Sequence, residues 1–258
     1  MSPYVEFRLA KEEDIIRFIL ELSYTLERER LKDRNYEPCI YVPIPKEIRN
    51  EILTTKNLKE DSKNKLKRII KRLIDMDRNE MKIFLDQIEK YWINNCESFY
   101  FEEIKKIIGK KFQNHLIVYI TNAITGAYFK DNKITLTYYK KMKRKELMSY
   151  ASSTIGEEIL HLIYWDIWKE VFNKNLEFED ILRIEGKRWS TWHISEIIPD
   201  YILIQNKNFR RFGWNKIDRT KTYKWIGDFK KIADPLWEKR RNLKDFILSI
   251  HKTCGCLP

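Results

Sequence analysis

Glycine and proline are scarce in this chain, which contains seven of each among 258 residues. Both residue types interrupt helices, whereas Leu, Ile, Lys and Glu, which are abundant here, favour them. Hydrophobic residues make up 43% of the chain. That is enough for a sizeable core in one large domain, or in one domain with an added lobe. We therefore predict a mainly helical protein.

Helical periodicity dominates the first hundred residues. Apolar residues three or four positions apart predict a helix over residues 11–33, and the prolines within residues 41–45 predict an extended link into another helix. Two apolar stripes then indicate further helical structure: Leu66, Ile69, Ile70, Leu73 and Ile74, followed by Met81, Phe84, Leu85, Ile88 and Trp92. We interpret residues 1–112 as a helical N-terminal lobe.

The middle of the chain has a different pattern. Residues 115–121 form a run of β-branched and aromatic side chains without a helical period, and residues 126–129 and 133–139 flank a turn-forming Lys-Asp-Asn. Apolar residues alternate with polar ones along 133–139, which is typical of a half-buried strand. The sequence therefore predicts an α+β protein, mainly helical with a small sheet. Residues 113–258 would form its second domain, with a single undivided domain as the alternative.

Helical patterns return after the expected sheet. They predict a long helix over residues 144–172, a shorter piece around 178–184 and another helix over 191–204. A last helix is expected to begin at Asp234, because aspartate is a good N-cap and Pro235 suits the first turn of a helix.

The long helix over residues 144–172 carries the residues with the clearest chemical potential. Glu157 and Glu158 precede His161 by four and three positions, so all three side chains share one helical face. Their surroundings are apolar, and carboxylates rarely stay buried without compensation. A metal ion is one natural partner for such a group.

In these residues and in the order of its elements, the chain resembles the zincin metallopeptidases of the gluzincin type, although the motif is altered. A sheet and hairpin are followed by a helix that carries an altered His-Glu-x-x-His motif. Glu158 matches the glutamate of this motif and His161 matches its second histidine, while Glu157 stands in place of the first histidine. The likeness covers about residues 115–205. It implies Glu158 as the general base, His161 and Glu196 as zinc ligands, and Asp200 as a supporting acid.

Three interpretations of this motif remain open. In the first, Glu157 replaces the missing histidine in a Glu/His/Glu metal site, which would suit zinc and also iron or manganese. In the second, the metal is lost, the acids pair with Lys or Arg, and the protein is a catalytically inactive interaction protein. In the third, Glu158 and His161 form half of a di-iron site, which needs a second Glu-x-x-His that the chain lacks.

His193 offers a further choice. It lies three residues before Glu196, so the two side chains share a helical face. His193 could supply the missing imidazole as an alternative metal ligand, or it could be a hydrogen-bonding partner of Glu196 or of a carbonyl group. The function that the resemblance implies is metal-dependent hydrolysis of a peptide or protein substrate.

Charge and cysteine content complete the expectations. The net charge of +12 leaves a basic nucleic-acid-binding protein as a further alternative. Because this charge is spread along the chain among many acids, we expect such binding to be weak, salt-sensitive and independent of nucleic-acid sequence. Residues 1–10 do not resemble a signal peptide, and no apolar run approaches the roughly 18 residues of a membrane span. The four cysteines lack CxxC spacing, which indicates reduced thiols and a cytoplasmic location without membrane association.

Overall fold

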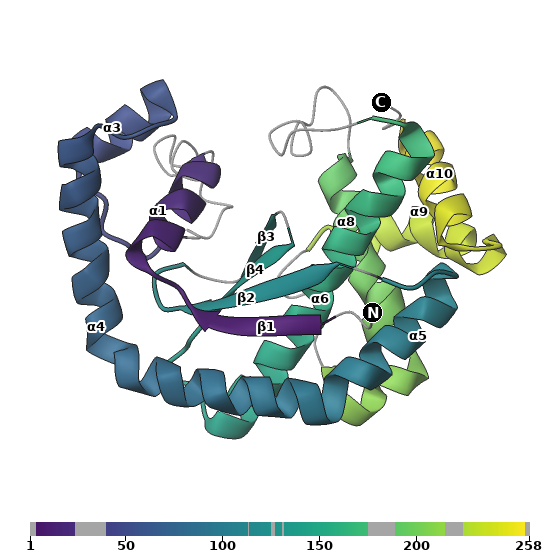
Figure 1. Ribbon diagram of the computed structural model, residues 1–258. Helices are drawn as coiled ribbons and strands as arrows, with labels where there is room; N and C mark the ends of the chain where they lie inside the picture. Colours follow the sequence, from purple (N-terminus) through teal and green to yellow (C-terminus); the bar gives the residue numbers. More distant parts are fainter. Residues whose placement is uncertain are drawn as a thin grey trace. The chain divides into compact units, whose positions relative to one another are not determined.

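The computed structural model shows a mainly helical α+β protein, as predicted (Figure 1). It describes residues 4–23, 40–112, 114–124, 127–130, 132–174, 189–214 and 224–255. The chain divides into two compact units. We call them the sheet unit (Val5–Tyr91 and His115–Ala151) and the helical unit (Met1–Tyr4, Trp92–Asn114 and Ser152–Pro258). This division differs from the expected boundary between residues 112 and 113, because the chain up to Tyr91 belongs with the sheet and Trp92–Asn114 belongs with the later helices.

The sheet unit is built on four strands in the order β1-β2-β4-β3. The strands are β1 (Tyr4–Leu9), β2 (His115–Thr121), β3 (Ala127–Lys130) and β4 (Lys133–Thr137). β2 and β4 are parallel, whereas β3 and β4 form the predicted antiparallel hairpin. The prediction of a half-buried β4 was wrong: Thr135 and Thr137 are as buried as their apolar neighbours, because β4 lies inside the sheet between β2 and β3. The first strand, β1, was not predicted.

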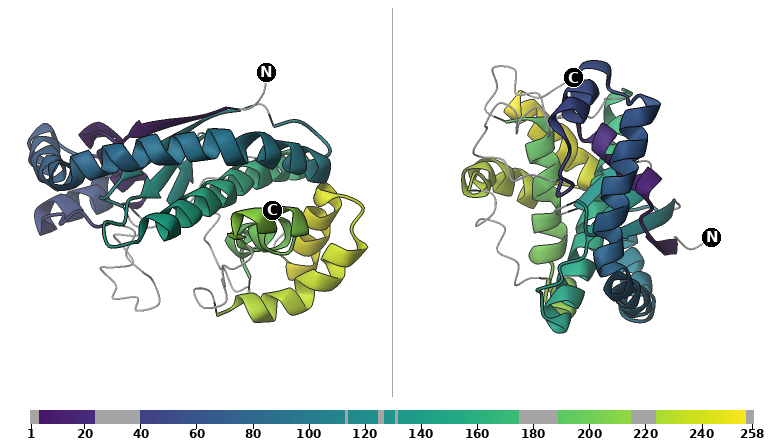
Figure 2. Two further views of the ribbon diagram at one scale, coloured as in Figure 1. Left: turned by 90° about the horizontal axis from the view of Figure 1, so that it is seen from below. Right: turned by 90° about the vertical axis from the view of Figure 1, so that its left-hand side faces the viewer.

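Three described helices accompany the sheet: α1 (Glu12–Glu21), α3 (Lys46–Thr55) and α4 (Glu60–Tyr91). α1 covers only the beginning of the expected helix over 11–33, and residues 24–39 lie outside the described ranges. α3 follows directly after the extended link, as predicted. Apart from Trp92, which begins the next element, the residues of the two apolar stripes belong to one continuous helix, α4, whose full length is visible in Figure 2. α4 contacts both α1 and β2.

The helical unit begins with a π-helix, η1 (Trp92–Glu97), and α5 (Ser98–Ile108). Its later elements are the part of α6 (Arg144–Phe172) from Ser152 onward, α8 (Thr191–Pro199), the π-helical η2 (Asp200–Ile204), the 3-10 helix η3 (Lys207–Phe212), α9 (Ile226–Lys239) and α10 (Leu243–Cys254). The predictions of helices over 144–172 and 191–204 are confirmed. The short piece expected around 178–184 lies outside the described residues.

The prediction of a last helix beginning at Asp234 was wrong. α9 has already begun at Ile226, and Asp234 instead accepts a hydrogen bond from the Tyr201 hydroxyl at 2.5 Å. The true start of the last helix is at Asn242, whose side chain accepts a hydrogen bond from the backbone N–H of Asp245 at 2.9 Å. Asparagine is a strong N-cap, and this cap begins α10.

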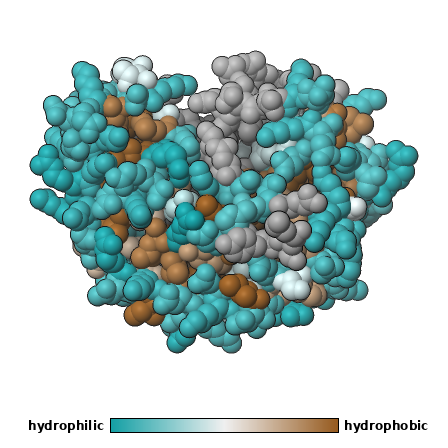
Figure 3. Space-filling view, viewed as in Figure 1, coloured by the Kyte–Doolittle hydropathy of each residue, from teal (hydrophilic) through white to brown (hydrophobic). Residues whose placement is uncertain are grey.

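Hydrophilic residues cover most of the face shown in Figure 3, as expected for a chain with 34% charged residues. Within the described ranges, no helix combines the length and the hydropathy that crossing a bilayer requires.

Candidate metal centre

The stretch of α6 around the motif is buried on nearly every side. From Ala151 to Trp168, only Glu157 and Asp166 are partly exposed. The apolar side chains that flank the motif account for this burial. This stretch of α6 therefore lacks the usual division into a solvent-exposed face and a buried face. Glu158 (8% exposed) and His161 (2%) are therefore held inside the protein. Polar groups in such a position need partners within the fold.

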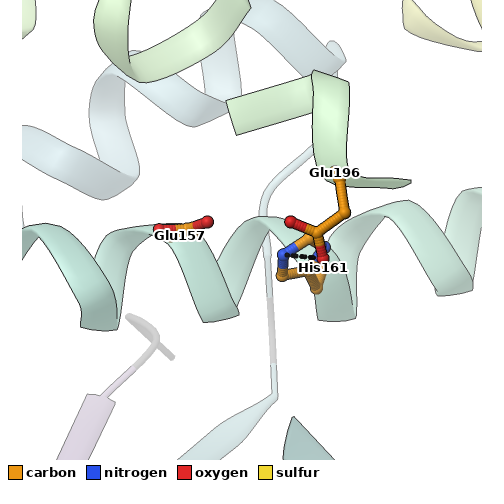
Figure 4. Close-up of side chains that lie close together, drawn as sticks. All are labelled: Glu157, His161 and Glu196. Atoms are coloured by element: carbon orange, nitrogen blue, oxygen red, sulfur yellow. Dashed lines mark ion pairs between the residues drawn. The ribbon is translucent and has the colours of Figure 1, made fainter. Parts of the chain in front are cut away.

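Glu196, on α8, completes a group with Glu157 and His161 of α6. One potential ligand atom from each of the three residues lies within 4.8 Å of the other two. Figure 4 shows the Glu196 carboxylate directly at the His161 ring, with Glu157 one turn earlier along α6. The closest of these contacts joins His161 Nε2 and Glu196 Oε1, which are 3.5 Å apart. The structure thus brings His161 and Glu196, which the resemblance implied as ligands, together with Glu157, which stands in place of the first histidine.

The chemistry of this group and the spacing of its closest pair suit a divalent cation. Hydrogen bonds from N–H to oxygen usually measure about 2.7–3.2 Å, so 3.5 Å between His161 Nε2 and Glu196 Oε1 is long for one. Two atoms that each bind a tetrahedral ion at about 2.1 Å lie about 3.4 Å apart, which matches the observed separation. One imidazole and two carboxylates are common ligands of divalent cations in proteins. Glu157 is the partly exposed member, so solvent reaches the group on its side.

Glu158 is not a member of the group. It follows Glu157 in the chain and precedes His161 by one helical turn. Its side chain is buried, so its carboxylate lies inside the protein rather than on the surface.

His193 has a different set of contacts from those expected of a ligand. Its Nδ1 accepts a hydrogen bond from the backbone N–H of Ser190 at 3.1 Å and lies 2.8 Å from the Ser190 hydroxyl. The rings of Trp189, Trp192 and Trp225 surround the imidazole, with centroids 5.4, 5.1 and 4.6 Å away. Burial lowers the pKa of His193 to about 4, so the ring is neutral near pH 7. The structure places His193 at the start of α8 and outside the group of three.

Asp200 also has a partner of its own. Its carboxylate lies 2.7 Å from the Lys230 ammonium of α9. The Asp200 side chain is almost fully buried, whereas Lys230 remains a quarter exposed. This ion pair joins the end of α8 to α9.

Sequence patterns gave no sign of the contacts beneath the motif. The Tyr100 hydroxyl, from α5, donates a hydrogen bond of 2.7 Å to the carbonyl of Gly156, the residue before Glu157. Trp214 donates from Nε1 to Ser152 Oγ at 3.1 Å. A Cβ atom on Gly156 would lie 3.1–3.3 Å from ring atoms of Tyr100 and Trp214. The glycine therefore allows α6 to pack closely against two aromatic side chains at the site.

No family model, curated protein or solved structure matches this chain. The resemblance to zincins therefore stays a prediction from the motif residues and the order of the elements.

Proposed function

We propose that Glu157, His161 and Glu196 bind one divalent transition-metal ion, and that the centre hydrolyses peptide bonds. The observation that carries this proposal is the convergence of the three side chains within 4.8 Å from two separate helices. Zinc is the ion that the resemblance implies, and iron and manganese suit the same ligands.

The protein side chains would divide the work as follows. When bound, the cation would supply Lewis acidity and lower the pKa of a water molecule beside it. Glu158 would accept the proton from that attacking water and pass it to the leaving amine, as a general base and then a general acid. The partly exposed side of the group, at Glu157, is where a substrate carbonyl would approach.

An inactive interaction protein is the alternative that the structure also supports. His161 and Glu196 already form an ion pair when the ring is protonated, and Asp200 is paired with Lys230. Such pairs compensate buried charge without a metal, which is what the loss of activity from a zincin-like scaffold would leave.

Three variants separate these functions in a peptidase assay with added metal. Glu158→Gln should lower the rate of hydrolysis by about 10²–10⁴-fold, because it removes the base and keeps the shape of the side chain. His161→Ala should also abolish hydrolysis, and it should lose the metal as well. Glu157→His restores the familiar motif and should retain zinc. If wild-type protein with bound metal cleaves no peptide in a diverse library, the hydrolase function is wrong.

A further inference from the structure

We propose that His193 is a positioning residue: by holding the first turn of α8 at Ser190, it fixes Glu196 against His161. This inference rests on the proposed metal centre. It assigns His193 a role that differs from both metal ligand and direct partner of Glu196.

The first support is the hydrogen bonding at the start of α8. Ser190 is the N-cap residue, with extended backbone angles, and His193 is the third residue of the helix. The two residues form a reciprocal capping box in which the His193 ring takes the place of the usual Glu or Gln. Because Nδ1 accepts the Ser190 N–H, it carries no proton, and the neutral ring has its proton on Nε2.

The second support is the fixed orientation of the ring. Trp189, Trp192 and Trp225 all meet the imidazole edge to face, with interplanar angles of 70–78°. His193 is 8% exposed, so its ring has little freedom to rotate away from Ser190. A buried ring held in this way fixes the point at which the chain enters α8.

The third support is the place of Glu196 within α8. The helix has nine residues, and helices this short depend on caps and packing for their stability. Glu196 lies between the His193 cap and the Asp200–Lys230 ion pair at the far end. A change at the start of the helix therefore acts on the turn that carries Glu196.

The test compares metal affinity in the full-length protein, with Mn²⁺ alone and Zn²⁺ alone as probes in calorimetric titrations. His193→Ala removes the acceptor and should weaken binding about 10–100-fold, the range expected for residues that orient ligands. His193→Asn places an oxygen where Nδ1 was and should recover affinity to within about 3-fold of wild type. The control is Asn242→Ala, which removes the cap of α10, a helix that carries none of the three residues, and should leave affinity unchanged.

Equal losses for His193→Ala and His193→Asn would overturn the proposal, as would an equal loss for Asn242→Ala. A wild-type protein that binds neither ion would contradict the proposed metal centre instead. In that case the metal-free protein still decides the role of His193, through urea unfolding of His193→Ala, Glu196→Gln and the double variant. Non-additive shifts of the urea midpoint are expected if His193 acts through Glu196, and additive shifts would refute it.

Discussion

α4 and α6 are two long helices of similar length that differ in where their charged and titratable side chains lie. The buried residues of α4 are all apolar, and its lysines and arginines lie toward solvent. Lys65 and Lys67 pair there with Glu47 and Glu13, in contacts of exposed or partly exposed side chains. α6 instead buries Glu158 and His161 within an apolar stretch.

This difference distinguishes charged side chains that only hydrate the surface from buried ones that point to a binding or catalytic site. An exposed ion pair contributes little, because water solvates both partners well. A buried carboxylate or imidazole is costly unless the fold supplies a partner, so its presence calls for a specific arrangement. The motif in α6 has such an arrangement with Glu196, whereas the basic stretch of α4 has the character of a solvated face.

The largest effect on stability that we predict concerns the close packing behind the motif. Gly156→Ala should lower the free energy of unfolding by about 1–3 kcal/mol, because the added methyl group would press on Tyr100 and Trp214. Gly227→Ala is the matched control, since a Cβ at Gly227 in α9 meets nothing within 4 Å. It should raise stability by about 0.5–1 kcal/mol through helix propensity alone. Urea unfolding measures both, and destabilisation by both variants would argue against tight packing at Gly156.

A smaller effect concerns the pH dependence of stability. Because burial lowers the pKa of His193 from 6.5 to about 4 in the folded protein, the unfolded chain takes up a proton first as the pH falls. The free energy of unfolding should therefore decline as the pH falls from about 6.5 toward 4, and this contribution should be fully present above pH 6.5. His193→Asn should flatten the profile in that window. Parallel profiles for the two proteins would show that the ring is not buried as described.

The smallest effect is expected on α4. Lys65→Met keeps the aliphatic part of the side chain and removes the ammonium group that pairs with Glu47. Because more than half of each side chain is exposed, the loss of stability should be much smaller than that of Gly156→Ala, and added salt should reduce it. Glu47→Gln should behave alike. A loss as large as that of Gly156→Ala would remove the contrast between the two helices.

Most helices and the hairpin could be predicted because each depends on a local pattern. The bounds of α6 follow from periodicity, and the β3–β4 hairpin follows from turn residues between two runs of strand character. β1 and the burial of Thr135 could not be predicted, since both depend on which strands lie next to each other in the sheet. The start of the last helix was misplaced because an Asp-Pro pair is typical of a helix start. Here Asp234 and Pro235 lie inside α9 instead.

In the candidate site, as in the fold, local features could be predicted and contacts between distant residues could not. Glu157 and His161 share a face by spacing alone, and the resemblance added Glu196 from a separate helix. The capping partner of His193 had a local signal, because Ser190 directly precedes α8. The contacts of Tyr100 with Gly156 and of Lys230 with Asp200 join residues far apart in the chain, and no local pattern indicates them.

The central claim is that Glu157, His161 and Glu196 bind a metal ion, and metal content tests it most directly. Protein purified without a metal-affinity tag would be equilibrated with Zn²⁺, Mn²⁺ or Fe²⁺, dialysed and measured by elemental analysis beside Glu158→Gln and His161→Ala. We predict about one ion per chain for wild type and Glu158→Gln, and a loss of binding in His161→Ala, because a ligand is removed only there. Wild-type protein that stays metal-free, or His161→Ala that retains the ion, would contradict the account.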